Sequence, residues 1–187
     1  MTANKNINDD TVITATRNWV EQIIIGLEFC PFAKREFLNN RVCFQVSCAQ
    51  NLEDCLHTLI YECQRLDNNP DIETTLLIFP DGMQIFDDFL DLTELANALL
   101  TDSGYEGIYQ LAHFHPDYCF EGSDDSDPAN YTNRSPWPTL HLIREASLEK
   151  VLEHYPEPEK IPEKNIERAR EMGINKLKAL LGECSGK

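Results

Sequence analysis

Residues 74–79 read TTLLIF, and Pro80-Asp-Gly follows them directly. A short, continuously apolar run that ends at a proline and a glycine is typical of a strand buried at the centre of a sheet. Amphipathic helices are predicted on both sides of this strand, over residues 52–66 and 85–100. Because strands that alternate with helices form a sheet covered by helices, this stretch and its two neighbours predict an α/β fold.

Three further strands and three further helices are predicted around this centre. The strands are expected over residues 41–47, 106–115 and 139–144, and the helices over 11–29, from Ser147 to before Pro156, and from Pro162 to Gly182. The order α-β-α-β-α-β-β-α-α predicts one layered domain with a mixed, roughly four-stranded sheet and about five helices, in the α/β class or alternatively the α+β class. The last two strands are expected to be antiparallel neighbours. The domain would comprise residues 9–187, after a flexible N-terminus of residues 1–8.

The charge and the cysteines of the chain narrow its partners and its compartment. The net charge is −16, from 32 acidic and 16 basic residues, and a field of this sign repels phosphate backbones and anionic membranes. We therefore expect neither nucleic acid nor a membrane as a partner. The first residues lack a basic start followed by an apolar run, and the seven cysteines form no Cys-x-x-Cys pair. A soluble, cytoplasmic protein is expected, and the sequence predicts no oligomeric state.

Polar and aromatic residues concentrate between His113 and Glu145. The connection 116–138 between the last two predicted strands has 23 residues, and loops of this length in a compact domain are usually either functional or disordered. Its Tyr, Phe, Trp and Pro residues favour an ordered loop. His113 and His115 are two residues apart in a predicted strand, so they share a face, and His141 of the next strand can face the same pocket.

Three roles are open for these histidines. His113, His115 and His141 together would suit a divalent transition metal such as Zn²⁺ or Fe²⁺, with a position left for water. Without a metal, His113, His115 and Glu145 are candidates for acid–base catalysis. The third alternative is that the imidazoles only form hydrogen bonds with the backbone around the loop.

A set of hydrogen-bond donors in the same block suggests an anion site. Asn133, Arg134 and Ser135 combine a guanidinium with neutral donors, which is a natural receptor for a carboxylate or phosphate, and Arg144 and Tyr118 are further candidates for ligand binding. The expected ligand is a small anionic molecule. The alternative is that Arg134 pairs with acidic residues of its own loop.

Cys30 is the remaining candidate catalytic residue. Pro31 could open a new helical turn capped by Cys30, and a helix N-terminus with Lys34 or Arg35 nearby favours a thiolate. Such a thiol would be a nucleophile or a redox sensor, with a histidine from the other motif as base. A buried cysteine at a helix kink is the structural alternative.

Three motifs suggest a family. They are Cys-Pro-Phe-Ala at 30–33, the block His113-Phe-His-Pro-Asp-Tyr followed by Asn133-Arg-Ser-Pro-Trp-Pro-Thr-Leu-His-Leu-Ile-Arg-Glu145, and Ile161-Pro-Glu-Lys-Asn165. Together they resemble domain-of-unknown-function family 1415 over nearly the whole chain. The resemblance implies a stand-alone soluble domain and supplies no activity, cofactor or catalytic residue.

Three classes of function follow from these residues. The first is a small-molecule enzyme or ligand-binding protein with a His-rich pocket under loop 116–138, which would perform metal-assisted hydrolysis or oxidation of an anionic substrate. The second is a thiol-based enzyme or redox sensor that uses Cys30. The third is a non-catalytic interaction domain that docks a protein through its aromatic loop.

Overall fold

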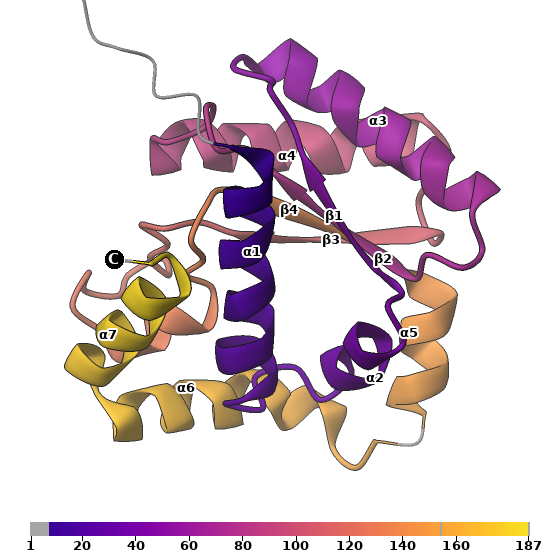
Figure 1. Cartoon of the computed structure of the whole chain (residues 1–187). Coiled ribbons are helices and arrows are strands. Elements are labelled where there is room, and N and C mark those ends of the chain that lie inside the picture. The colour runs from indigo at the N-terminus through magenta and orange to yellow at the C-terminus, as the bar shows by residue number, and fades with distance from the viewer. Residues whose placement is uncertain (1–7, 154, 187) are drawn as a thin grey trace, which may run out of the picture.

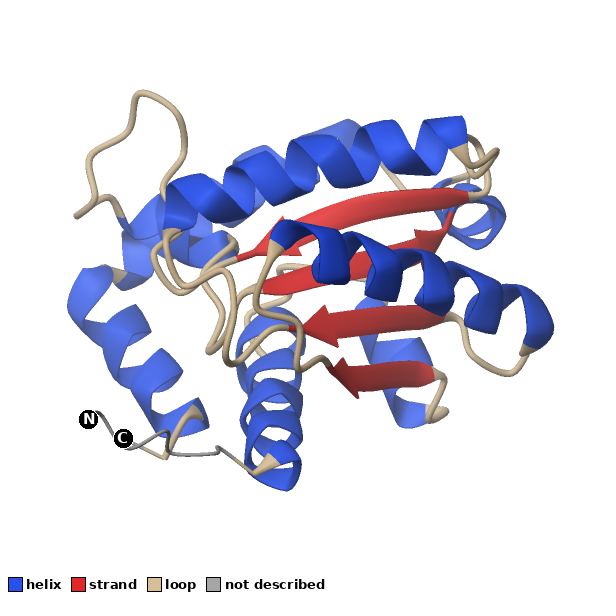
Figure 2. Ribbon diagram, turned by 90° about the horizontal axis from the view of Figure 1, so that it is seen from above, coloured by secondary structure: helices blue, strands red, loops and turns tan. Residues whose placement is uncertain are grey.

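The computed structural model describes residues 8–153 and 155–186, and a four-stranded mixed sheet lies at its centre (Figure 1). The strands are β1 (Val42–Val46), β2 (Thr74–Ile78), β3 (Tyr109–Phe114) and β4 (Thr139–Arg144), in the order β1-β2-β4-β3. β1 and β2 are parallel, whereas β4 is antiparallel to both of its neighbours, so one arrow in Figure 2 points against the other three. The predicted class and strand number are confirmed, and so is the antiparallel pairing of the last two strands.

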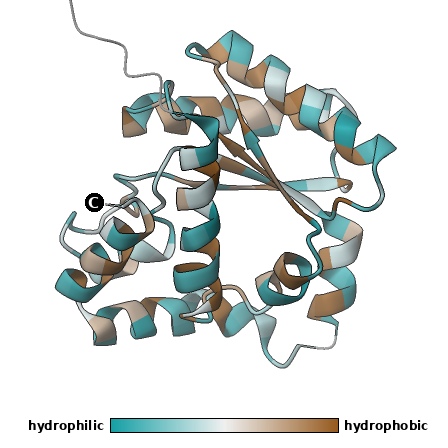
Figure 3. Ribbon diagram, viewed as in Figure 1, coloured by the Kyte–Doolittle hydropathy of each residue, from teal (hydrophilic) through white to brown (hydrophobic). Residues whose placement is uncertain are grey.

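Helices cover both faces of the sheet (Figure 1). The helices of the first face are α3 (Leu52–Asn68) and α4 (Phe86–Asp102); those of the second are α1 (Asp9–Trp19), α6 (Ile161–Met172) and α7 (Ile174–Cys184). Leu77 of β2 and Leu140 of β4 face the first group, and Leu76 of β2 faces the second. The ribbon is coloured hydrophobic along much of the strands, and hydrophobic and hydrophilic residues alternate along the helices (Figure 3). Fully burying one such leucine stabilises the fold by roughly 1.5–3 kcal/mol.

Shorter elements complete the chain. They are the π-helical turn η1 (Val20–Ile25), α2 (Ala33–Leu38), the 3-10 turns η2 (Pro128–Thr132) and η3 (Pro158–Lys160), and α5 (Glu145–Leu152). α2 lies beside β1, where the rings of Phe37 and Phe44 meet edge to face with 6.5 Å between centroids. No helix among the described residues is long and apolar enough to span a bilayer.

The boundaries differ most from the predicted ones in three places. The helix predicted over 11–29 becomes α1 and η1, followed by a tight turn. The final helix breaks into α6 and α7 at Gly173, whose φ of 77° and ψ of 154° cannot continue a helix. The strand predicted from residue 106 starts at Tyr109, because Gly107 adopts a positive φ of 75° in a turn. The predicted flexible N-terminus lies outside the described residues, apart from Asn8, which caps α1.

Candidate functional site

His115 fastens loop 116–138 to the rest of the protein. Its side chain is fully buried between the rings of Phe86 and Phe89 of the α4 region, 5.1 and 5.2 Å away by centroid. The backbone N–H of Asp117 donates to Nδ1 over 3.0 Å, so the ring proton lies on Nε2, which donates to the carbonyl of Met83 at 3.0 Å. Burial lowers the pKa of His115 and keeps the ring neutral. Because both nitrogens are engaged, His115 is neither a free metal ligand nor a free base.

The expected convergence of the three histidines is wrong. In the β3–β4 register, His113 lies opposite Leu140, and His141 lies opposite Ala112. Leu140 faces α3 and α4, so His113 does as well, and His141 points to the other face of the sheet. The set formed by His113, His115 and His141 therefore does not fit one metal ion. Over residues 8–153 and 155–186, no group of three or more His, Cys, Asp or Glu side chains is placed to hold a metal.

The two remaining histidines occupy separate environments. His113 is half-buried, its ring lies 5.6 Å from that of Tyr118 by centroid, and burial lowers its pKa. His141 lies on the α1 face with its Nε2 2.6 Å from Oγ1 of Thr74, and burial lowers its pKa to about 4. Glu145 follows the end of β4, which pairs with the start of β3, so it lies at the opposite end of the strand from His113. Glu145 is therefore not placed to act together with His113 or His115.

The donors expected to bind an anion are directed mainly at the backbone. Arg134 donates from Nε to the Tyr118 carbonyl at 3.0 Å and from a terminal nitrogen to the Asp125 carbonyl at 3.1 Å. Its guanidinium also lies 4.8 Å above the ring centre of Tyr131. Asn133 and Ser135 donate to the carbonyls of His113 and Trp137. The alternative interpretation of Arg134 as a brace within its own loop describes these contacts, although its partners are carbonyls and not carboxylates.

Arg144 has a similar structural role at the end of α3. Its guanidinium donates to the carbonyls of Leu66, Asn69 and Ile72, at 2.5, 3.3 and 3.1 Å. A cation at the C-terminal end of a helix interacts favourably with the helix dipole. The sequence analysis makes Arg144 a candidate for ligand binding, but its N–H groups donate to carbonyls of the α3–β2 connection.

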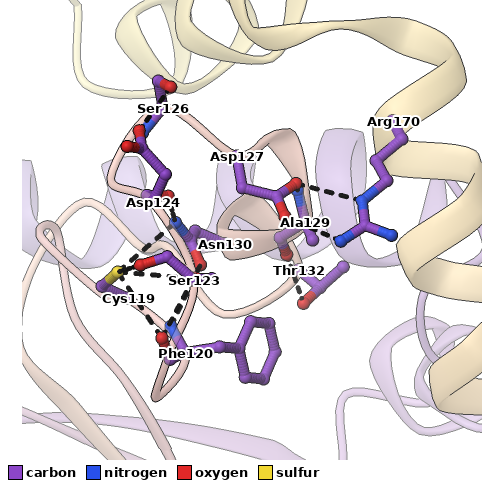
Figure 4. Close-up of polar contacts among 10 residues, drawn as sticks. All are labelled: Cys119, Phe120, Ser123, Asp124, Ser126, Asp127, Ala129, Asn130, Thr132 and Arg170. Atoms are coloured by element: carbon purple, nitrogen blue, oxygen red, sulfur yellow. Dashed lines mark hydrogen bonds and ion pairs between the residues drawn. The ribbon is translucent and has the colours of Figure 1, made fainter.

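Two polar side chains that sequence reasoning had not selected keep the loop ordered (Figure 4). The buried Asn130 accepts hydrogen bonds from the backbone N–H of Phe120 and the hydroxyl of Ser123, both at 3.0 Å. Asp127 receives both Nε and a terminal nitrogen of Arg170 of α6, at 3.1 and 2.7 Å, and this pairing lowers the pKa of Asp127 to about 2. Loop 116–138 is therefore an ordered, packed element that is joined to α6 by the Asp127–Arg170 ion pair.

A tight turn after η1 leads the chain into Cys30. The N–H of Phe29 bonds to the carbonyl of Ile24 and that of Glu28 to Ile25, the pairing that closes a helix in a Schellman motif. Glu28 occupies the position usually taken by glycine, with a φ of 56°. The turn buries Phe29 in the core, where its carbonyl accepts a 2.6 Å hydrogen bond from the Asn165 amide of α6. α6 is thereby held against the turn, below the end of α1 and beside α2 in Figure 1.

A cavity of about 390 Å³, termed the Cys30 cavity, lies between this turn and α6. One wall is formed by Ile25, Glu28, Cys30, Pro31 and Lys34, and the other by Tyr155, Ile161, Lys164, Asn165 and Arg168. The four α6 residues have the spacing i, i+3, i+4, i+7, which places them on one helix face. Apolar, thiol, amide and cationic groups therefore surround one space of a size typical for small-molecule sites.

The family identified from the sequence is shown by comparison. The family described as "Protein of unknown function (DUF1415)" matches residues 11–179, which is most of the chain. This chain belongs to that family. No curated protein and no solved structure matches it.

Two of the three motifs that suggested DUF1415 form opposite walls of the Cys30 cavity. Cys30 and Pro31 come from the first motif, and Ile161, Lys164 and Asn165 from the last. Local sequence patterns do not join segments that are about 130 residues apart along the chain. One signal could have pointed to this helix face, because Lys164 of the last motif and Arg168 just after it are both basic and four residues apart.

In this DUF1415 chain the lining of the Cys30 cavity has a positive net charge, and the thiol within it is neutral. Lys34, Lys164 and Arg168 carry three positive charges and Glu28 one negative charge. Burial raises the pKa of Cys30, although the backbone N–H groups of Phe32 and Ala33 oppose that shift. The expected thiolate is therefore not the favoured form. Arg35, the other cation expected to lower this pKa, is largely exposed and pairs with Glu36.

Proposed function

We propose that this protein binds a small organic anion in the Cys30 cavity. The observation that carries the proposal is the gathering of Lys34, Lys164 and Arg168 around one cavity, in a chain whose net charge is −16. The ammonium groups of Lys34 and Lys164 form no hydrogen bond or ion pair with a described residue. Two ammonium groups are thus available to an incoming anion, which the rest of this acidic chain would repel.

The non-charged lining supports an organic ligand over a simple inorganic ion. Ile25 and Ile161 supply apolar surface, and the Tyr155 ring packs edge to face on Phe32 with 5.6 Å between centroids. Asn165 directs its amide nitrogen to the Phe29 carbonyl, which leaves its oxygen as an acceptor for a ligand hydroxyl. Apolar walls with a few convergent polar groups are the usual composition of a ligand pocket.

A thiol-dependent reaction in the same cavity is the second candidate. The backbone N–H groups of Phe32 and Ala33 favour the thiolate of Cys30. A bound substrate that shortened these hydrogen bonds, or that placed a base next to the sulfur, would activate the thiol as a nucleophile. The residues described in the lining include no histidine that could act as base. Binding of an anion in a cavity whose thiol stays neutral therefore explains more of the lining residues than nucleophilic catalysis by Cys30 does.

Calorimetric titration with benzoate and phenyl phosphate tests the proposal. We expect saturable binding of at least one probe, weakened about fivefold by Lys164→Gln, because a solvent-screened charge pair at 4 Å is worth roughly 1 kcal/mol. The matched control is Lys178→Gln, which removes an exposed lysine of α7 outside the cavity and should leave binding unchanged. Bound probe should also slow alkylation of Cys30. If neither probe binds, or if both lysine variants behave alike, the cavity is not an anion site.

A further inference from the structure

Glu28 occupies an unusual place in the Cys30 cavity, because it is a carboxylate in a lining that also contains three cations. Its Oε2 lies 2.7 Å from a terminal nitrogen of Arg168. The two side chains are 76% and 44% exposed, so the carboxylate can leave the guanidinium without uncovering any packed surface. Arg168 and Lys34 lower the pKa of Glu28, so the group is an ionised carboxylate near neutral pH.

From this arrangement we infer that Glu28 is an internal counter-ion that holds the place of the ligand, and that the ligand is a small phosphate monoester whose phosphoryl group displaces Glu28 from Arg168. This inference rests on the proposed function and names the class of anion. The backbone of Glu28 lies in the closing turn of η1, with a φ of 56°, and this sets the point from which its side chain extends. A residue other than glycine is unfavourable there, and a Glu at that point places a carboxylate across the cavity from α6.

The charge balance selects a phosphate over a carboxylate. Once Glu28 is displaced, Lys34, Lys164 and Arg168 leave three positive charges in the lining. A phosphate monoester carries about −1.5 to −2 at pH 7, so it neutralises more of this charge than the single negative charge of a carboxylate does. Arg168 uses only one terminal nitrogen for Glu28, and its remaining donors have no hydrogen-bond partner among the described residues. A planar guanidinium whose other two nitrogens are free suits the bidentate recognition of phosphate oxygens.

The size of the cavity and the net charge of the protein favour a small free phosphate monoester over a phosphate group on a membrane or a nucleic acid. A cavity of about 390 Å³ accommodates a phosphate and a short carbon skeleton. The net charge of −16 opposes approach to an anionic membrane or a nucleic acid. The phosphoryl group would lie among Lys34, Lys164 and Arg168, with the carbon skeleton towards Ile25 and Ile161.

The test compares phenyl phosphate with benzoate, which share an aromatic ring and differ in the anionic group. We expect the full-length protein to bind phenyl phosphate at least about tenfold more tightly than benzoate at pH 7.5. Glu28→Gln removes the internal competitor and should tighten phenyl phosphate binding about fivefold. The matched control Glu167→Gln removes an exposed carboxylate of α6 that directly precedes Arg168 in the chain and lies outside the cavity lining, and it should change the affinity less than twofold. Phenyl phosphate binding should weaken as the pH falls through about 6, where the phosphate loses its second charge.

The outcomes separate this inference from the proposed function. If benzoate binds as tightly as phenyl phosphate and Lys164→Gln weakens both, the cavity is an anion site and the phosphate inference is wrong. If Glu28→Gln leaves phenyl phosphate binding unchanged or weaker, Glu28 is not a competitor. If neither probe binds to the wild type or to Glu28→Gln, the proposed function fails and this inference fails with it.

Discussion

Protonation of His141 is expected to destabilise the protein as the pH falls from about 6.5 to 4. Burial lowers the pKa of this imidazole from 6.5 to about 4 in the folded chain. A histidine with a depressed folded pKa contributes stability that is complete above its unfolded pKa and is lost as the pH falls towards the folded value. At ~1.4 kcal/mol per pKa unit, the difference corresponds to about 3 kcal/mol, most of which is lost between pH 7 and pH 4.5.

Urea unfolding of the wild type and of His141→Gln at pH 7 and pH 4.5 measures this contribution. The glutamine can keep a hydrogen bond to Thr74 but does not titrate, so the loss of unfolding free energy on acidification should be smaller in the variant by about 2–3 kcal/mol. His57→Gln is the matched control, because His57 is exposed on α3, and it should keep the wild-type pH dependence. Equal pH dependence in the wild type and His141→Gln would refute the burial of His141 on the α1 face.

Three further substitutions or reactions test the contacts around the loop and the thiol. His115→Ala is expected to reduce the unfolding free energy by about 2–4 kcal/mol, since it leaves the Met83 carbonyl and the Asp117 N–H without their partner; a loss below 1 kcal/mol in urea titration would contradict this role. Trp19→Phe removes the 2.9 Å hydrogen bond from the indole to the Arg134 carbonyl and should cost about 1–2 kcal/mol, with circular dichroism as a check that α1 persists. The exposed Cys48 should be alkylated by iodoacetamide before Cys30, whose pKa is raised by burial; mass spectrometry that finds Cys30 modified first would favour the thiol-enzyme alternative.

The strands could be predicted because their apolar patterns are local. Residues 74–79 and 139–144 were expected as strands, and β2 (Thr74–Ile78) and β4 (Thr139–Arg144) occupy nearly the same positions. The helix α2 was expected only as a helical turn that Pro31 could open, since its six residues include no buried side chain and hence no apolar stripe that marks its length. The π-helical turn was not predicted, because the apolar spacing of the first helix continues through it.

The grouping of the histidines failed for a reason that the sequence does not contain. Whether His141 shares a face with His113 depends on which residue of β4 lies opposite which residue of β3, and a shift of one residue reverses the answer. The register is set by the 23-residue loop, whose own hydrogen bonds tie residues 133 and 135 to His115. The periodicity within one strand does not say which residue of a second strand lies opposite it when a long loop joins the two. His113 and His115 could therefore be assigned to one face of β3, but the face of His141 could not be predicted.

The polar block of residues 113–145 is connected to the candidate site through α6. Asp127 of the loop holds Arg170, and Arg170 lies six residues after Lys164 on the same helix, which places it on a different face. Trp19 fastens the other side of the loop to α1, just before η1 and the turn that carries Glu28 and Cys30. Both walls of the Cys30 cavity are thus connected to the loop, although none of the residues lining the cavity lies within it. The density of polar residues in the block therefore marks the scaffold that positions α6 and the turn, and the chemistry is expected where these two elements meet.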